Sequence, residues 1–299
     1  MSALTCRFSI SIRTGCQSWN RCNTLGVQTS LFSSSSVGNS WLYSLCCETE
    51  NRQLASSIMS GIPSITNAID VAAMRKPYKG GQETFTEQDL VAKEPLAQFT
   101  AWFKIAMEQD TIGEANAMTL ATASKEGRPS ARMVLLKGYD KRGFKFFTNY
   151  ESRKGRELVD NPYASLCFYW EPLHRSVRIE GRVERLSEEE STEYFHSRPP
   201  TSQISAIVSK QSTVIENRDV LTHKDAELRK KYLGTGVTIP KPDYWGGFRV
   251  IPDVVEFWQG QSNRLHDRII FRRPTQDEKI DTKLLHQGED GWVYERLSP

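Results

Sequence analysis

The sequence predicts an α+β domain in which an antiparallel sheet closes toward a barrel and helices surround it. Three observations predict this fold class. Five strand-like segments follow one another between residues 117 and 186, most of their connections are short, and helix-favouring segments lie on either side of them. Short connections favour antiparallel neighbours, because parallel strands need a crossover of about a dozen residues or more.

The first elements follow from side-chain periodicity. Leu96, Phe99 and Trp102 recur at near-helical spacing and predict an amphipathic helix over 95–109. Gly127-Arg128-Pro129 is one of the turn sequences that separate the strands after it. These strands are expected over 117–123, 131–137, 144–148, 164–170 and 176–186.

The remaining elements alternate between helix and strand. Ser187 and Glu190 have the spacing of a capping box, which predicts a helix running toward His196. The charged segment 217–231 favours another helix. Further strands are expected over 247–251, 254–258, 268–271 and 292–297. No internal repeat is evident, so one domain over 59–299 is expected, with ordered structure from near Met74.

Residues 1–58 differ in composition from the rest. They are rich in Ser, Cys and Asn, and residues 1–47 hold three arginines and no carboxylate. Two interpretations stay open, an organelle transit peptide and a disordered extension. The expected location is therefore cytoplasmic, or mitochondrial if this leader targets the chain. Only Cys167 lies beyond the leader, so no disulfide framework is expected.

Composition excludes several function classes. Residues 48–299 hold 36 basic against 36 acidic residues, a poor balance for binding nucleic acid. No apolar run approaches the roughly 20 residues of a membrane span. The chain has no Gly-x-Gly-x-x-Gly after a strand, no P-loop, no Gly-x-Ser-x-Gly and no His-Glu-x-x-His. Its five histidines lack metal-ligand spacing, so no metal is expected.

Cations embedded in apolar segments are the first candidates for function. Arg132 and Lys137 belong to one predicted strand, where a two-residue period places them on opposite faces unless a bulge intervenes. Pairing with carboxylates at the edge of the core would explain them equally well. After the next strand, Ser152 can cap a helix whose first residues are Arg153 and Lys154, and such a helix start is a strong anion site. The alternative is an exposed basic turn.

Two further segments combine cations with other polar groups. Tyr194, Arg198 and Ser202 recur at four-residue steps, although Pro199-Pro200 predicts that the helix breaks between them. Arg198 could equally be a cation at a helix end. Arg264, His266 and Arg268 alternate, and on an extended backbone they would project to one side, where an anionic ligand would offset their repulsion. A solvated loop is the alternative.

Taken together and in this order, these segments resemble the pyridoxine/pyridoxamine 5′-phosphate oxidase family. The resemblance extends from about Met74 to Pro299 and is most specific in Glu256-Phe257-Trp258-Gln259-Gly260 followed by Arg264-Leu265-His266-Asp267-Arg268. It implies a split β-barrel with surrounding helices, a six-stranded type of antiparallel barrel that binds FMN. It also implies a homodimer with each flavin at the subunit interface.

The resemblance also implies roles for individual residues. The implied FMN contacts are Arg132, Met133, Val134, Leu135, Phe147, Thr148, Arg153, Lys154, Gln211, Ser212, Trp258 and Arg268. The implied substrate contacts are Lys137, Tyr194, Arg198, Ser202, Arg264, Leu265 and His266, and Arg264 and His266 are the implied catalytic residues. The segment 75–78 resembles a lid. Ser176 stands where relatives usually have a Gln beside the flavin, which puts that contact in doubt.

The implied activity is oxidation of pyridoxamine 5′-phosphate and pyridoxine 5′-phosphate to pyridoxal 5′-phosphate. A hydride equivalent leaves C4′ of the substrate for flavin N5, and O₂ then takes the electrons to give hydrogen peroxide. Two alternatives remain. A split-barrel flavin reductase or stress-related protein would not need the substrate set, and a carrier of pyridoxal phosphate would consume no oxygen.

Overall fold

A computed structural model describes residue 74, residue 78 and residues 84–276 and 278–299. Met74–Pro299 form one compact unit. The predicted leader, 1–58, lies outside the described residues, as do residues 75–77 of the predicted lid. Within the described part of the chain, no helix is both long enough and apolar enough to cross a membrane.

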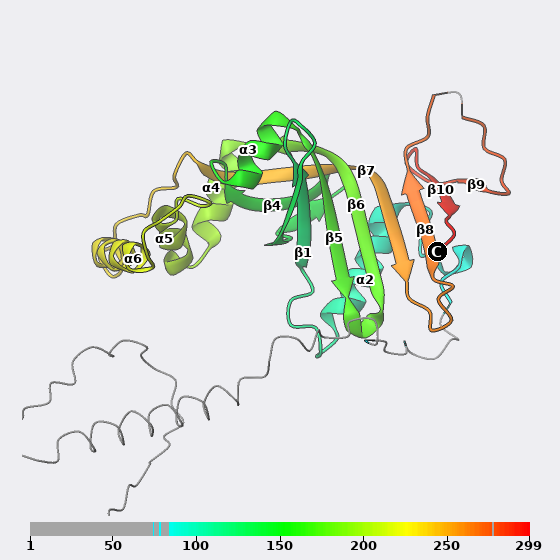
Figure 1. Cartoon of the computed structure of the whole chain (residues 1–299), viewed down its shortest axis with the longest axis horizontal. Coiled ribbons are helices and arrows are strands. Elements are labelled where there is room, and N and C mark those ends of the chain that lie inside the picture. The colour runs from blue at the N-terminus through cyan, green and yellow to red at the C-terminus, as the bar shows by residue number, and fades with distance from the viewer. Residues whose placement is uncertain (1–73, 75–77, 79–83, 277) are drawn as a thin grey trace, which may run out of the picture. The chain divides into compact units, whose positions relative to one another are not determined.

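A ten-stranded antiparallel sheet forms the framework, with the strand order β2-β1-β5-β6-β7-β8-β10-β9 and a β3–β4 hairpin attached through β4 to β7 (Figure 1). The fold is of the α+β split-barrel class. The strands are β1 (Ala117–Ala123), β2 (Pro129–Leu135), β3 (Gly138–Asp140), β4 (Gly143–Asn149), β5 (Tyr163–Trp170), β6 (Arg175–Arg185), β7 (Trp245–Gln259), β8 (Asp267–Arg272), β9 (Leu285–Gln287) and β10 (Val293–Arg296).

Helices pack around the sheet, and α4, α5 and α6 group together on the side away from β8 and β10 (Figure 1). The helices are η2 (Glu87–Asp89), α2 (Pro95–Met107), α3 (Arg153–Asp160), η3 (Glu171–Leu173), α4 (Glu188–Ser197), α5 (Pro200–Val208) and α6 (Asp219–Tyr232). The helices expected over 95–109 and 217–231 and toward His196 are therefore confirmed. Ser187 begins α4 as expected, since its side chain accepts from the Glu190 N–H.

The antiparallel arrangement is confirmed, but a simple meander is wrong. β4 pairs with the distant β7, whereas β5 pairs with β1, so the β3–β4 hairpin is bypassed in the strand order. The strands expected over 247–251 and 254–258 are one long strand, β7. Pro252 lies within it opposite Gly181, where the register of β6 shifts. A Cβ at Gly181 would overlap the Ile251 carbonyl, so this close crossing requires glycine.

The core lies between α2 and the sheet. Glu94 begins α2 by accepting hydrogen bonds from the N–H groups of Leu96 and Ala97, and Pro95 occupies the first turn, where its missing N–H costs nothing. Phe99 is fully buried, and its ring contacts the rings of Phe144 and Phe168 at centroid distances of 5.0 and 5.2 Å. Burial of one such side chain contributes about 2–3 kcal/mol. This packing fixes the sheet on which the site is built.

A second apolar cluster holds α4 and α5 against the start of β7. It consists of the buried side chains of Phe195, Ile204, Val208, Ile239 and Trp245. The predicted break at the two prolines is confirmed, because α4 ends at Ser197 and α5 begins at Pro200. The cluster therefore fixes two short helices whose junction carries Arg198.

Candidate functional site

A pocket of about 730 Å³ lies among β2, β4, the start of α3, α4 and α5. It brings together most of the residues predicted to contact FMN or the substrate phosphate. Those that line it are Arg132, Met133, Val134, Leu135, Lys137, Phe147, Thr148, Arg153, Lys154, Tyr194, Arg198, Gln211 and Ser212. No Asp or Glu is among the lining residues that the structure describes. The pocket is therefore cationic on an apolar strand wall.

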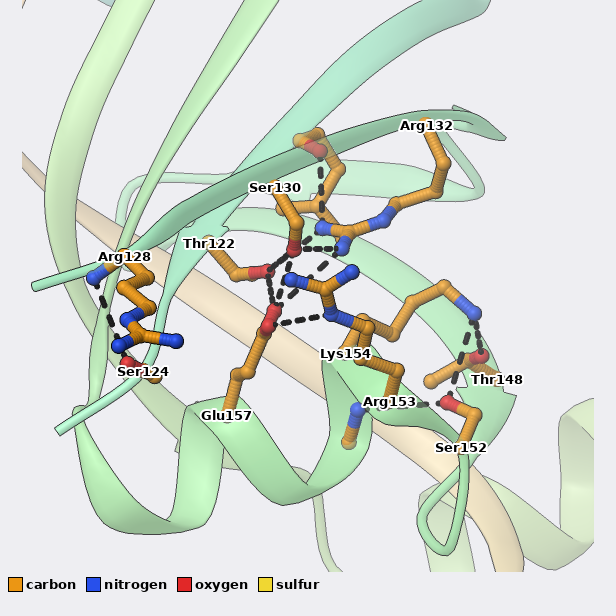
Figure 2. A network of polar contacts seen from close by, with 12 residues as sticks. Thr122, Ser124, Arg128, Ser130, Arg132, Thr148, Ser152, Arg153, Lys154 and Glu157 are labelled. Atoms are coloured by element: carbon orange, nitrogen blue, oxygen red, sulfur yellow. Dashed lines mark hydrogen bonds and ion pairs between the residues drawn. The ribbon is translucent and has the colours of Figure 1, made fainter. Parts of the chain in front are cut away.

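The start of α3, where the sequence predicts an anion site, contributes two cations to this pocket (Figure 2). Ser152 caps the helix by accepting from the Gly155 N–H. Lys154 is buried, and its Nζ donates to Thr148 Oγ1 at 3.2 Å and to Gln211 Oε1 at 2.8 Å. Burial, together with repulsion from Arg132, lowers the pKa of Lys154 to about 8. Among the described residues no carboxylate pairs with Lys154, so its charge is available to an anion in the pocket.

This pKa predicts that anion binding weakens at alkaline pH. A bound phosphate favours the protonated amine, and Lys154 in the free protein loses its proton as pH rises through about 8. Affinity for FMN should therefore be full below about pH 7.5 and fall by up to about tenfold per pH unit above 8. Flavin fluorescence titrations between pH 7 and 9.5 measure this. Lys154→Arg keeps its charge and should flatten the profile, whereas a fall that persists in Lys154→Arg would contradict the assignment.

Arg132 lies in β2 and is held by several acceptors. Its Nη1 donates to the Leu120 carbonyl at 3.1 Å and to Thr122 Oγ1 at 2.6 Å, while Nη2 lies 3.4 Å from Glu157 Oε2. The expectation of carboxylate pairing is thus met for Arg132. Lys137 lies beyond the end of β2, so the strand period does not apply to it and both cations line one pocket.

Sequence reasoning missed Glu157, which lies in α3 behind the two arginines (Figure 2). Its Oε1 accepts from Arg153 Nε at 2.8 Å, and its Oε2 accepts from Thr122 Oγ1 at 2.5 Å and from Ser130 Oγ at 2.6 Å. Burial alone would raise the pKa of Glu157, but these hydrogen bonds outweigh it and lower the pKa to about 2. The four-residue spacing of Arg153 and Glu157 on a helix was the only signal in the sequence.

A second group of polar side chains enters the pocket at the junction of α4 and α5. Tyr194 stacks on Phe147 at 3.9 Å between ring centroids, and the Arg198 guanidinium lies 4.8 Å from the Trp245 ring. Arg198 Nη2 donates to the Ser202 carbonyl, whereas its buried Nη1 has no hydrogen-bond partner among the described residues. Ser202 itself does not line the pocket. Burial lowers the pKa of Arg198 and raises that of Tyr194.

The predicted catalytic residues lie elsewhere on the chain, in the loop between β7 and β8. Here the extended backbone expected from 264 to 268 is wrong, because Arg264 lies in a turn with φ of 68° and strand β8 begins only at Asp267. Trp258 and Arg268 lie in the flanking strands, and Arg268 Nε donates to Glu256 at 2.6 Å. Leu265 is exposed. None of these residues lines the cationic pocket of the same chain.

His266 is oriented by the backbone of its own loop. The Gln261 N–H donates to His266 Nδ1 at 3.0 Å, so the neutral ring carries its proton on Nε2. Burial and the nearby Arg264 lower the pKa of His266, although Asp267 opposes the shift. Tyr78, from the predicted lid, packs beside this loop, with its ring centroid 6.0 Å from that of His266.

Asp267 ties this loop to both ends of the domain. Its Oδ2 accepts from the Phe85 N–H at 3.0 Å and from Gln261 Nε2 at 2.8 Å, and its Oδ1 accepts from Arg296 Nη1 at 2.9 Å. Arg296 also pairs with Glu87. Asp267 therefore connects the loop to the segment before α2 and to β10.

Asp267→Asn should loosen the loop without disturbing the pocket. It removes the charge that pairs with Arg296, so the loop that carries Arg264 and His266 should shift. Because small displacements of reacting groups lower rates steeply, kcat for the predicted oxidation should fall by about tenfold or more. Steady-state kinetics with flavin content measured in parallel provide the test. Glu295→Gln, which removes a carboxylate bonded to Arg272 instead, is the matched control. An unchanged kcat in Asp267→Asn would show that the loop holds its geometry without this contact.

A smaller pocket of about 320 Å³ lies on the exposed face of β5, β6 and β7. Trp258, Ser176 and Cys167 line it, and Ser176 Oγ donates to the Phe168 carbonyl at 2.9 Å. The Ser176 hydroxyl is thus hydrogen-bonded to the neighbouring strand β5 of the same sheet. No cluster of three or more His, Cys, Asp or Glu able to hold a metal ion occurs in the described part of the chain.

The sequence matches known protein families and relatives over most of the described chain. Residues 106–232 match the pyridoxamine 5′-phosphate oxidase family, and residues 245–299 match the pyridoxine 5′-phosphate oxidase C-terminal dimerisation region. The pyridoxine/pyridoxamine 5′-phosphate oxidase of Bombyx mori is 59% identical over 232 residues, 78% of this chain and 90% of the relative. The pyridoxine-5′-phosphate oxidase of Bos taurus is 57% identical over 234 residues, 78% of this chain and 88% of the relative.

A solved structure supports the same conclusion about the fold. PhzG from Burkholderia lata 383, in complex with tetrahydrophenazine-1-carboxylic acid, superposes with a TM-score of 0.63 at 30% identity and covers 74% of this chain and 100% of that chain. The antiparallel sheet and this likeness define a split-barrel protein, whose described pocket is lined by cations. The matches to relatives identify the family within this class: the chain belongs to the pyridoxine/pyridoxamine 5′-phosphate oxidase family.

Proposed function

We propose that this protein is an FMN-dependent oxidase that converts pyridoxamine 5′-phosphate and pyridoxine 5′-phosphate to pyridoxal 5′-phosphate. The observation that carries the proposal is a single pocket with two groups of cations and no carboxylate among its described lining residues. The reaction needs two phosphate-bearing molecules, the cofactor and the substrate, in one place. Arg132, Arg153 and Lys154 form one group, while Lys137 and Arg198 form the other.

The first group fits the phosphate of FMN. Lys154 has no carboxylate partner among the described residues, and it lies in the first turn of α3, which Ser152 begins (Figure 2). The start of a helix favours an anion. Met133, Val134 and Leu135 provide a strand wall against which a flat ring can lie. When bound, FMN supplies the redox chemistry, taking a hydride equivalent from the substrate and passing the electrons to O₂.

The second group fits the phosphate of the substrate. Arg198 Nη1 is buried without a partner among the described residues, and a bound phosphate oxygen would satisfy it. Lys137 and the Tyr194 hydroxyl line the same pocket and can donate as well. These contacts act by positioning, because they fix the substrate through a group remote from the reacting carbon.

Arg264 and His266 act on the reacting end of the substrate in this proposal. Arg264 is exposed and can orient the substrate and stabilise the negative charge that the flavin would gain on reduction. His266 holds a proton at Nε2 and can donate it in a hydrogen bond to the substrate amine or hydroxyl. Its lowered pKa keeps the ring neutral near pH 7. A neutral substrate amine can release a hydride without a general base, so His266 need not remove a proton.

A homodimer would bring the two halves of the site together. Residues 245–299, which match the dimerisation region, include Trp258, Arg264, His266 and Arg268. These residues do not line the pocket of their own chain, so we propose that the loop between β7 and β8 completes the pocket of the partner subunit. Each flavin would then lie at the subunit interface.

Oxygen consumption by the purified, FMN-loaded protein tests the proposed reaction. Uptake with pyridoxamine 5′-phosphate, accompanied by aldehyde formation, is expected, and pyridoxamine without the phosphate should react far more slowly. If the yellow protein takes up no oxygen, a flavin reductase becomes the better interpretation when a nicotinamide cofactor reduces the flavin. A carrier becomes the better one when pyridoxal phosphate binds without turnover.

For its location, we propose that the chain works in the cytoplasm, or in the mitochondrion if residues 1–58 act as a transit peptide. The segment contains arginines and serines and no carboxylate before Glu48. Fusing 1–58 to a fluorescent reporter decides between the two. Arg7, Arg13 and Arg21 replaced by Gln should abolish import, and a diffuse signal from the unaltered fusion would remove the transit-peptide interpretation.

A further inference from the structure

Glu157 does not line the cationic pocket, but its carboxylate pairs with two arginines that do. Glu157 is 7% exposed, and its carboxylate contacts Arg132 and Arg153, which do line the pocket (Figure 2). A carboxylate near a phosphate site would ordinarily weaken binding through repulsion. Its position behind the guanidinium groups therefore needs an explanation.

Both oxygens of Glu157 are used to fix the arginines. Oε1 accepts from Arg153 Nε at 2.8 Å, and both Nη groups of Arg153 have no hydrogen-bond partner among the described residues. Oε2 lies 3.4 Å from Arg132 Nη2 and is held there by the hydroxyls of Thr122 and Ser130. Three different elements, β1, β2 and α3, thus meet at one carboxylate.

The charge of the site also depends on Glu157. Arg132, Arg153 and Lys154 carry three positive charges, and Glu157 removes one, which leaves a formal charge of two. A phosphate monoester carries about −1.5 to −2 at pH 7. With Glu157 in place, the cluster matches a monoester dianion, and the long, flexible arginine side chains are held in position before the ligand arrives.

We propose that Glu157 is a positioning residue that presents Arg132 and Arg153 to the terminal phosphate of FMN and so makes the pocket select phosphorylated over unphosphorylated flavin. This inference rests on the proposed FMN site and identifies the group that organises it. Glu157 touches neither flavin nor substrate in this arrangement. Its effect should therefore be confined to the part of the binding affinity that the phosphate contributes.

The test compares FMN with riboflavin, which lacks the phosphate. The full chain, stripped of flavin, is titrated with each compound, and flavin fluorescence gives the two Kd values. Glu157→Gln keeps the size of the side chain but removes its charge, so the FMN affinity should fall by about tenfold or more while the riboflavin affinity stays within about twofold. Thr122→Val removes a hydroxyl that donates to Glu157 and accepts from Arg132, and it should reduce the ratio of the riboflavin Kd to the FMN Kd to a lesser extent.

Glu190→Gln is the matched control, because Glu190 also bonds two cations, Lys145 and Arg249, outside the pocket lining. It should leave the ratio of the two Kd values unchanged. A parallel loss of FMN and riboflavin binding in Glu157→Gln would assign Glu157 a general structural role and overturn the proposal. So would an unchanged ratio. If the unaltered protein itself failed to prefer FMN, the proposed cofactor would fall together with this inference.

Discussion

Arg264→Leu should lower kcat/KM for pyridoxamine 5′-phosphate by about 100-fold to 1,000-fold, the range seen when one donor to developing charge is removed. Arg264 is exposed and lies in a turn at φ of 68°, a conformation that leucine adopts at a cost similar to arginine. The replacement therefore removes the guanidinium without a core defect. The protein should stay folded and yellow.

Two measurements separate a catalytic effect from a folding effect. Flavin content per chain should match that of the unaltered protein, and so should the midpoint of thermal unfolding. Arg142→Leu is the control, because Arg142 is an exposed arginine in the β3–β4 turn, outside the cationic pocket. Full activity in Arg264→Leu would remove this residue from the site, and loss of flavin would reassign it to cofactor binding.

The sequence predicts local structure well because side-chain periods reflect burial. In β1 half-buried and buried residues alternate, with Met118 and Leu120 among the buried ones, and the strand has the expected bounds, 117–123. The pairing of β4 with β7 could not be predicted in this way. It joins residues about 100 positions apart, such as Thr148 and Gly246, and no local period records which strands become neighbours.

The two strands expected on either side of Pro252 show a second limit of such reasoning. Proline within a strand argues for a break, since it lacks an N–H for the ladder. In the folded protein Pro252 lies at the register shift opposite Gly181, so β7 continues through it. The compensating glycine belongs to another strand, and the local sequence around Pro252 carries no sign of it.

The pocket was predictable where one short motif contains the whole arrangement. Ser152, Arg153 and Lys154 form the helix start by themselves, and the family resemblance extended this to the strand wall of Met133 and Val134. Glu157 escaped notice because its partners Thr122 and Ser130 lie 35 and 27 residues away in the sequence. Their convergence depends on β1 and β2 packing against α3. A short motif indicates which residues can contact a bound molecule, but it does not indicate which other side chains hold those residues in position.

Arg132→Ala should raise the Kd for FMN by roughly 30-fold or more, since truncating one member of a hydrogen-bonded charge pair costs about 2–5 kcal/mol. The change removes donors to the ligand and also one partner of Glu157, whose carboxylate would then repel the phosphate more strongly. Arg132→Lys keeps a charge but lacks the planar fork and should be intermediate. Equilibrium dialysis against FMN measures all three proteins. A saturated, yellow Arg132→Ala protein at nanomolar FMN would contradict this role.

Combining the two altered proteins tests the shared site directly. If the loop of one subunit completes the pocket of its partner, a hybrid of Arg132→Ala and Arg264→Leu subunits has one site with both changes and one with neither. Random reassociation makes about half of the dimers hybrid. At an FMN concentration that saturates the unaltered pocket but leaves the Arg132→Ala pocket largely empty, mixing the two proteins should therefore restore about a quarter of full activity. If both halves of the site came from one chain, every site in the mixture would carry one change, and activity would stay at the level of the parents.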